Sequence, residues 1–223
     1  MEISQHVINR YDTMFLEGRT PWIRAEIPNP VKLFSELVLK KGNSQKVLDV
    51  GCGNGWISIY LAQHGMKIEG IDSSRSAIQQ AKRLAEKKKV FDNLHFSVGN
   101  ALEFPFKANT FDAVFDRGMF HHQPQKNWPL YKKGLLRVLR SGGLYYLGVF
   151  SNSSSKNGFS PKMARRMWQK AKDSNRFWFY DHYFDNKIIK RIFESHFSII
   201  SAIKDKIPSK DGSLLLNCIL RKK

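Results

Sequence analysis

A short glycine-rich stretch offers the clearest chemistry in this chain of 223 residues. It covers residues 49–55 and reads DVGCGNG. Glycines let the backbone turn tightly and let a ligand approach it without meeting a Cβ atom. A helix that begins directly after such a turn presents unsatisfied N–H groups to the ligand. The stretch therefore predicts a binding loop for a nucleotide-like cofactor, provided that a strand precedes it and a helix follows it.

The flanking residues supply these elements. KVLDV (46–50) is a short apolar run ending at glycines, which is typical of a buried strand. Residues 56–63 predict a helix that Gly65 ends. KIEGID (67–72) predicts a second strand, and its last residue is Asp72. A carboxylate at that position can accept hydrogen bonds from both hydroxyls of a ribose.

Strands and helices continue to alternate along the chain. Further helices are expected at about 74–89, 128–139 and 187–194, and further strands at 95–98, 111–116, 144–150, 197–203 and 213–220. Gly142 and Gly143 are expected to end the helix that precedes 144–150. The alternation predicts an α/β fold in which a mostly parallel sheet is covered on both faces. The last two strands are joined by a short turn, so they are expected to pair antiparallel.

The spacing of the glycines separates two classes of cofactor. Dinucleotide-binding proteins carry G-x-G-x-x-G, whose glycines make room for a pyrophosphate. This chain carries G-x-G-x-G after an acid at Asp49. That D-x-G-x-G-x-G order resembles the signature of class I S-adenosylmethionine-dependent methyltransferases. In that family the loop holds the methionine portion of the cofactor, which has no phosphates.

The resemblance covers residues 46–150. FDAVFDRGMFHH (111–122) resembles the family's fourth-strand motif, and LLRVLRSGGLYYLGVF (135–150) resembles its helix, double-glycine turn and fifth strand. It implies S-adenosylmethionine as the cofactor and a Rossmann-like three-layer sandwich: a mostly parallel seven-stranded sheet with one antiparallel strand at the C-terminal end. Asn100 stands where the family usually has an acid beside the adenine, and its amide oxygen can still accept from the adenine amino group. The residues expected to bind the cofactor are Trp22, Asp49, Gly51, Cys52, Gly53, Gly55, Asp72, Ser73, Asn100, Ala101 and Asp116.

Candidate catalytic residues follow the fourth strand. Ligands of such sheets bind outside the carboxyl ends of the strands, so Asp116, His121 and His122 are expected near the transferred methyl group. Any of them can take a proton from a hydroxyl or amine acceptor, whereas a thiolate needs no base. A structural role for the two histidines stays open. Cys52 fits a small buried side chain better than a nucleophile, and the two cysteines of the chain predict neither a disulfide framework nor a metal site.

The N-terminal residues carry a second resemblance. Residues 18–22, GRTPW, resemble the G-x-x-P-W segment of thiol, halide and thiopurine methyltransferases and of tellurite-resistance-type relatives, with Ile23 where an aspartate often follows. In those families the tryptophan region closes over the cofactor and shapes the acceptor pocket. A single methyltransferase domain over 1–223 is therefore expected. Its parts are a helical lid (1–45), a cofactor-binding core (46–150), a basic aromatic insertion on the acceptor side (151–190) and a final strand pair (191–223).

Positive charge is concentrated in the second half of the chain. Residues 126–223 hold 21 basic and 6 acidic side chains, whereas residues 1–125 hold 16 and 13, which gives a net charge of +18 for the whole. Such a field attracts anions. Residues 156–191 combine ten Lys or Arg with eight aromatic residues, which suits an anionic planar acceptor or the bases and phosphates of RNA. A hydrophobic lid with a solvated basic face is the alternative interpretation.

Three functions remain open from the sequence. The leading hypothesis is methyl transfer to a small-molecule acceptor, such as a thiol or an anionic aromatic compound. The alternatives are an RNA methyltransferase that uses the basic C-terminal half, and a cofactor-binding protein without turnover. The chain starts without a signal-peptide pattern and has no run of 18 apolar residues, so a cytoplasmic protein without a membrane span is expected.

Overall fold

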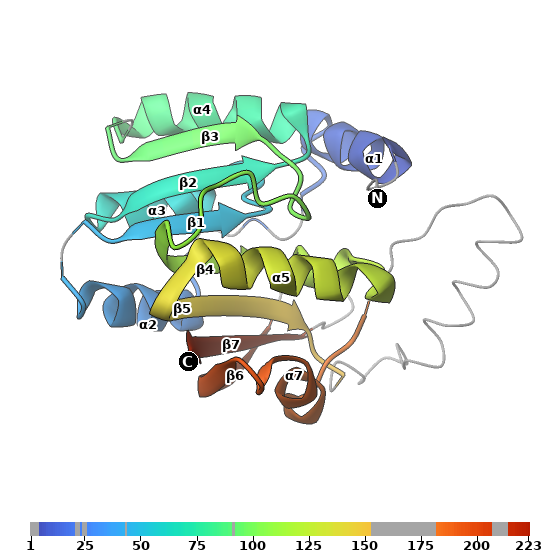
Figure 1. Cartoon of the computed structure of the whole chain (residues 1–223). Helices are drawn as coiled ribbons and strands as arrows, with labels where there is room; N and C mark the ends of the chain where they lie inside the picture. The colour runs from blue at the N-terminus through green and yellow to red at the C-terminus, as the bar shows by residue number, and fades with distance from the viewer. Residues whose placement is uncertain are drawn as a thin grey trace, which may run out of the picture.

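The computed structural model describes residues 5–20, 23, 26–42, 44–90, 92–152, 182–206 and 214–223. Within them, seven strands form one sheet in the order β3-β2-β1-β4-β5-β7-β6 (Figure 1). The strands are β1 Lys46–Val50, β2 Lys67–Asp72, β3 Leu94–Val98, β4 Phe111–Arg117, β5 Leu139–Phe150, β6 Phe197–Lys206 and β7 Leu214–Lys222. β7 pairs antiparallel with both β5 and β6, while the other pairings are parallel. This confirms the predicted mostly parallel sheet with one antiparallel strand.

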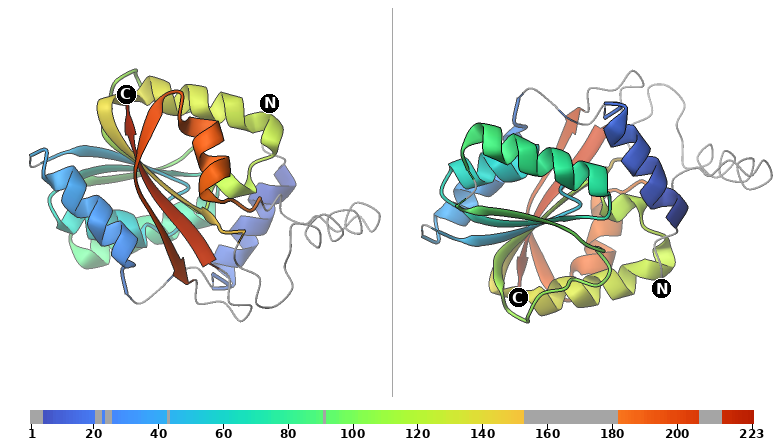
Figure 2. Two further views of the ribbon diagram at one scale, coloured as in Figure 1. Left: turned by 90° about the horizontal axis from the view of Figure 1, so that it is seen from below. Right: turned by 90° about the horizontal axis from the view of Figure 1, so that it is seen from above.

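Helices cover both faces of the sheet and make it the middle of three layers (Figures 1 and 2). The helices are α1 Gln5–Leu16, α2 Asn29–Leu39, α3 Trp56–Gln63, α4 Arg75–Lys88, α5 Trp128–Val138 and α7 Asn186–Phe193, with short 3-10 turns at Phe120–His122 and Gln125–Asn127. One core lies between the sheet and α5 and α7, and a second lies between the sheet and α2, α3 and α4. In the described residues, no helix combines the length and the apolar character needed to cross a membrane.

Local sequence explains where α4 begins and which face it buries. The Ser74 hydroxyl accepts the Ala77 N–H at 3.0 Å and caps the helix. Ala77, Ile78 and Ala81 are buried, at the spacing of one helical face. The helix is thereby held against β2 and β3, with its N-terminus at the carboxyl ends of these strands.

The junction between α5 and β5 differs from the prediction. Gly142 and Gly143 do not end the helix, because α5 already ends at Val138 and β5 begins at the next residue. Lys222 Nζ donates to the carbonyls of Leu136 and Leu139 at 2.7 and 2.6 Å. These bonds satisfy carbonyls that the end of a helix leaves unpaired. Because Lys222 of β7 caps α5, the helix can pass directly into β5.

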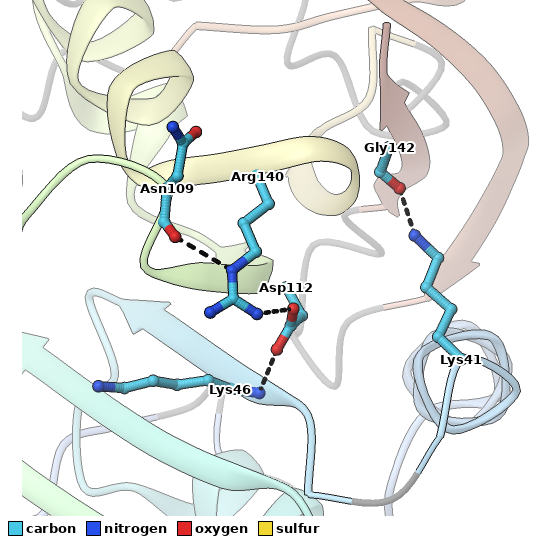
Figure 3. A network of polar contacts seen from close by, with 6 residues as sticks. All are labelled: Lys41, Lys46, Asn109, Asp112, Arg140 and Gly142. Carbon is cyan, nitrogen blue, oxygen red and sulfur yellow. Dashed lines mark hydrogen bonds and ion pairs between the residues drawn. The ribbon is translucent and has the colours of Figure 1, made fainter.

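A polar network ties together the amino ends of β1, β4 and β5 (Figure 3). The Asp112 carboxylate accepts the backbone N–H of Lys46 at 2.8 Å and pairs with the Arg140 guanidinium. Nε of Arg140 also donates to the Asn109 carbonyl at 3.0 Å. The network fixes this edge of the sheet and leaves the opposite edge, at the carboxyl ends of the strands, to the loops.

Candidate active site

A cavity of about 180 Å³ opens at the carboxyl ends of β1, β2, β4 and β5. Ligands of open parallel sheets bind at this edge. Of the expected site residues, those that line the cavity are Asp49, Gly51, Cys52, Gly53, Asp72, Ser73, Ala101, His121 and His122. The lining also includes residues that the sequence did not indicate, among them Tyr11, Phe15, Trp56, Gly99, Arg117, Met119, Gln123 and Phe150. The predicted loop and the predicted histidines thus meet in one cavity.

The glycine loop lies at one end of this cavity. The Gly51 N–H donates to the Ile71 carbonyl at 2.8 Å and fastens the loop to β2. Gly53 has a φ of +54°, and a Cβ atom on it would lie 3.1 Å from Cζ of Phe15. A side chain at this position would meet both backbone strain and a close contact. The loop therefore keeps its backbone bare toward the cavity.

Gly55 has a structural role. It does not line the cavity, and its φ is +75°. A Cβ atom there would lie 2.3 Å from Cζ of the buried Phe96 on β3. The third glycine of the motif thus allows α3 to begin tightly against the sheet, and the cofactor contact expected for it stays a prediction.

Asp72 is held in place by the loop and by α4. Gly53 N–H donates to Oδ2 of Asp72 and Ser74 N–H donates to Oδ1, each at 2.9 Å. Burial raises the pKa of Asp72, while the two backbone donors oppose that rise. The carboxylate is therefore fixed at the cavity wall, with the orientation set by backbone groups.

Asp49 lies beneath the loop and still reaches the cavity. The Ser58 hydroxyl donates to its Oδ2 at 2.5 Å. Burial raises the pKa of Asp49 to about 7, with the Ser58 hydrogen bond acting in the opposite direction. A cationic ligand bound nearby would favour the ionised carboxylate.

Asn100 builds a turn and does not reach the cavity lining. Its Oδ1 accepts the Leu102 N–H at 2.9 Å, and its Nδ2 donates to Oε1 of Glu103 at 3.0 Å. Its neighbours Gly99 and Ala101 do line the cavity. The amide oxygen that was expected to contact adenine thus accepts one backbone hydrogen bond, and its contact with adenine stays a prediction.

The two histidines form a hydrogen-bonded pair. Their Nε2 atoms are 3.0 Å apart, so one ring donates a hydrogen bond that the other accepts. His121 is 1% exposed and its ring lies 4.0 Å from the ring of Phe150. Burial, followed by the neighbouring His122, lowers the pKa of His121 well below its usual value, so this imidazole is neutral at neutral pH. His122 is half-buried and lies edge-on to Tyr11.

Asp116 supports the histidines from below and does not line the cavity. Its Oδ1 accepts the N–H groups of Met119 and Phe120 at 3.0 and 3.3 Å, and its Oδ2 accepts the Tyr131 hydroxyl at 2.8 Å. The side chain is fully buried, and burial raises its pKa to about 6. It fixes the turn that carries His121 and His122. Its two expected roles, in catalysis and in cofactor binding, stay predictions.

Helix α1 closes another side of the cavity, beside the start of α4 (Figure 2). Asp12 accepts the Ser76 N–H at 3.0 Å and the hydroxyls of Ser74 and Ser76 at 2.5 and 2.7 Å. Burial alone would raise the pKa of Asp12, but these hydrogen bonds outweigh it and lower the pKa. This fastening brings Tyr11 and Phe15 to the cavity wall.

Two parts of the predicted site lie outside the described residues. They are Trp22, with its neighbour Pro21, and residues 153–181 of the basic aromatic segment. The N-terminal resemblance and the acceptor-side insertion therefore stay predictions.

Comparison with known proteins identifies the class of domain. Residues 47–143 match the family described as "Methyltransferase domain". This chain contains a class I, S-adenosylmethionine-dependent methyltransferase domain. The matched residues run from β1 into β5 and include the glycine loop, Asp72 and both histidines.

The methyltransferase domain is similar to enzymes named for small-molecule substrates. The chain is 34% identical over 120 residues to 27-O-demethylrifamycin SV methyltransferase of Amycolatopsis mediterranei, covering 53% of this chain and 43% of the relative. It is 29% identical over 139 residues to 2-heptyl-1-hydroxyquinolin-4(1H)-one methyltransferase of Mycobacteroides abscessus, covering 62% and 60%. The chain thus spans about half the length of these curated relatives.

A solved structure shares the fold along nearly the whole chain. It is Burkholderia thailandensis 1,6-didemethyltoxoflavin-N1-methyltransferase with bound 1,6-didemethyltoxoflavin and S-adenosylhomocysteine. The TM-score is 0.71 at 17% identity, over 97% of this chain and 87% of the other. At this identity the likeness concerns the fold.

Proposed function

We propose that the protein transfers a methyl group from S-adenosylmethionine to a small-molecule acceptor, a thiol or an anionic aromatic compound. The observation that carries this proposal is the division of the cavity. The glycine loop and Asp72 line one end, and His122 and Phe150 line another part of the same wall. Such a division suits a cofactor and an acceptor held side by side, with water excluded between them.

The cofactor end has groups that fit each part of the cofactor. The Asp72 carboxylate suits the ribose hydroxyls, and the loop backbone at Gly51 and Gly53 suits the methionine portion. The Asp49 carboxylate suits the cationic groups, acting through the loop. Gly99 and Ala101 are small residues on the cavity wall and suit the adenine. When bound, the cofactor supplies an electrophilic methyl group on its sulfonium.

At the acceptor end, His122 is the better candidate for a general base. It is half-buried on the cavity wall, whereas His121 is almost fully buried and would carry a charge only at a high cost. In this proposal His122 takes the proton of a hydroxyl or amine acceptor, and the hydrogen bond to His121 orients its ring. A thiolate acceptor needs no such step. Asp116 acts as a positioning residue through the turn that it holds.

Methyl-labelled S-adenosylmethionine, incubated with the purified protein and a cell lysate, tests the proposal. We expect label in the small-metabolite fraction. His122→Gln is expected to lower the transfer to a hydroxyl or amine by about 10² to 10⁴-fold without changing cofactor affinity, with His64→Gln as the control. Label in RNA would replace the proposal with the RNA alternative. Cofactor binding without label in any fraction would favour the non-catalytic alternative.

A further inference from the structure

The cavity carries opposite charges on different parts of its wall. Asp49 and Asp72 lie at the cofactor end, whereas Arg117, the last residue of β4, lines the cavity together with both histidines. Of the cavity-lining residues that the structure describes, Arg117 is the single lysine or arginine. A guanidinium stays protonated at every pH at which the protein is folded, unlike an imidazole.

The fold makes room for this arginine. Arg117 stands opposite Gly148 in the pairing of β4 with β5. A Cβ atom on Gly148 would lie 2.9 Å from Cγ of Arg117 and 3.2 Å from Oδ1 of Asn217. The missing side chain at Gly148 therefore leaves the space in which the arginine stem lies. Nε and one Nη atom of Arg117 are buried, so most of the guanidinium is enclosed by protein.

A chain of neutral groups orients the guanidinium. Arg117 donates a hydrogen bond to the Tyr146 hydroxyl, which in turn donates to Oδ1 of Asn217 at 2.7 Å. Burial raises the pKa of Tyr146 although the positive charge of Arg117 opposes the rise, so the phenol is neutral. The Tyr146 hydroxyl thus fixes the direction of the guanidinium.

The charge of Arg117 reaches the acceptor end of the cavity. Burial lowers the pKa of His121, and His122, His182 and Arg117 lower it further. His121 is therefore kept neutral, and the arginine provides the fixed positive charge there. Phe150 and Tyr11 supply aromatic surface on the same cavity wall.

We propose that Arg117 determines acceptor specificity: its guanidinium binds a carboxylate on an aromatic acceptor whose ring packs against Phe150. This inference rests on the proposed function and names the residue and the ligand group that choose the acceptor. It assigns binding, and no bond-making step, to Arg117. A hydrogen bond from a charged guanidinium to a carboxylate is shorter and stronger than one between neutral groups, so a single contact from Arg117 adds affinity and fixes the acceptor's orientation.

Binding of two matched probes to the protein saturated with S-adenosylhomocysteine tests the inference. The probes are naphthalene-2-carboxylate and its uncharged carboxamide, compared by calorimetry in the wild type, Arg117→Met, Arg117→Lys and the exposed control Arg83→Met. We expect the wild type to prefer the carboxylate. Arg117→Met should lower the affinity for the carboxylate by about tenfold or more. It should change the affinity for the carboxamide by less than about twofold. Arg117→Lys should retain part of the preference, and Arg83→Met all of it.

Several outcomes would overturn the assignment. They are a wild type that does not bind the carboxylate or does not prefer it, and an Arg117→Met variant in which both probes weaken equally. Thermal unfolding of each variant separates loss of binding from loss of folding. Failure of the wild type to bind S-adenosylhomocysteine would contradict the proposed function itself, and that measurement is made before either probe is added.

Discussion

The Tyr131 hydroxyl donates to Oδ2 of Asp116 at 2.8 Å, and both side chains are fully buried. The other oxygen of this carboxylate accepts two N–H groups of the turn that carries His121 and His122. Tyr131 belongs to α5, which packs on the face of the sheet away from α3 and α4. The position of the histidines therefore depends on a contact made outside the cavity.

Removing the hydroxyl in Tyr131→Phe should destabilise the protein. The Oδ2 atom of Asp116 would lose its side-chain donor in a site that water does not reach, so we expect the free energy of unfolding to fall by about 1–3 kcal/mol. Urea denaturation measures this change. Tyr60→Phe, at a partly buried tyrosine on α3, is the control and should change stability by less than about 0.5 kcal/mol. Equal effects of the two substitutions would contradict the role of the buried hydrogen bond.

Asp116 should make stability depend on pH. Its pKa is about 6 in the folded protein, above the usual 3.8, so the folded state binds this proton more tightly than the unfolded state. The contribution to the free energy of unfolding is therefore full at low pH and decreases as pH rises from about 4 to about 6. Urea denaturation across this range should show a smaller decrease in Asp116→Asn than in the wild type. Asp92→Asn, at an exposed residue, serves as the control. If the free energy of unfolding of Asp116→Asn falls with pH as steeply as that of the wild type, another group is responsible.

Weakening the attachment of α1 should open the cavity. Asp12→Asn replaces an anion that accepts from Ser74 and Ser76, and the helix that brings Tyr11 and Phe15 to the cavity should detach more often. We expect faster amide hydrogen exchange in α1 and a several-fold weaker affinity for S-adenosylhomocysteine, with α5 unchanged. Because the pKa of Asp12 is lowered in the folded protein, the wild-type attachment should itself weaken as pH falls below about 4. Unchanged exchange in α1 would exclude Asp12 as its anchor.

The third glycine of the loop should tolerate substitution poorly. Gly55→Ala combines a left-handed backbone with a collision against buried Phe96, so we expect a loss of about 2–4 kcal/mol in the free energy of unfolding. Gly142→Ala is the matched control, since Gly142 has a φ of +68° but nothing within 4 Å of the added atom. It should cost about 1 kcal/mol. Chemical denaturation of the two variants compares them directly, and a similar loss in both would mean that only the backbone angle matters.

The cofactor end of the site could be predicted because its determinants are local in sequence. Residues 46–72 contain a strand, a glycine turn, a helix and a second strand in order, and each has its own signal. Asp72 then follows from its place at the end of that strand. The structure confirms these elements, with α3 at the predicted residues 56–63.

Apart from His121 and His122, the residues at the proposed acceptor end could not be predicted, because they come from distant elements. Tyr11 comes from α1, Arg117 from β4 and Phe150 from β5, and the strand order brings them to one cavity. The prediction of where α5 ends was wrong for the same reason. Its cap is Lys222, on β7, whereas the local sequence pointed to two glycines. At Asn100 the family resemblance gave the side-chain amide a ligand role. In the structure this amide also stabilises a local turn.

The network of Asp112, Lys46 and Arg140 lies at the edge of the sheet opposite the cavity (Figure 3). Its bonds join β1, β4 and β5 at their amino ends, while the loops at their carboxyl ends make the cavity. Substitutions in these loops leave the network intact. Variation at one rim of the sheet can therefore change the cavity, while the contacts at the opposite rim continue to join the three strands.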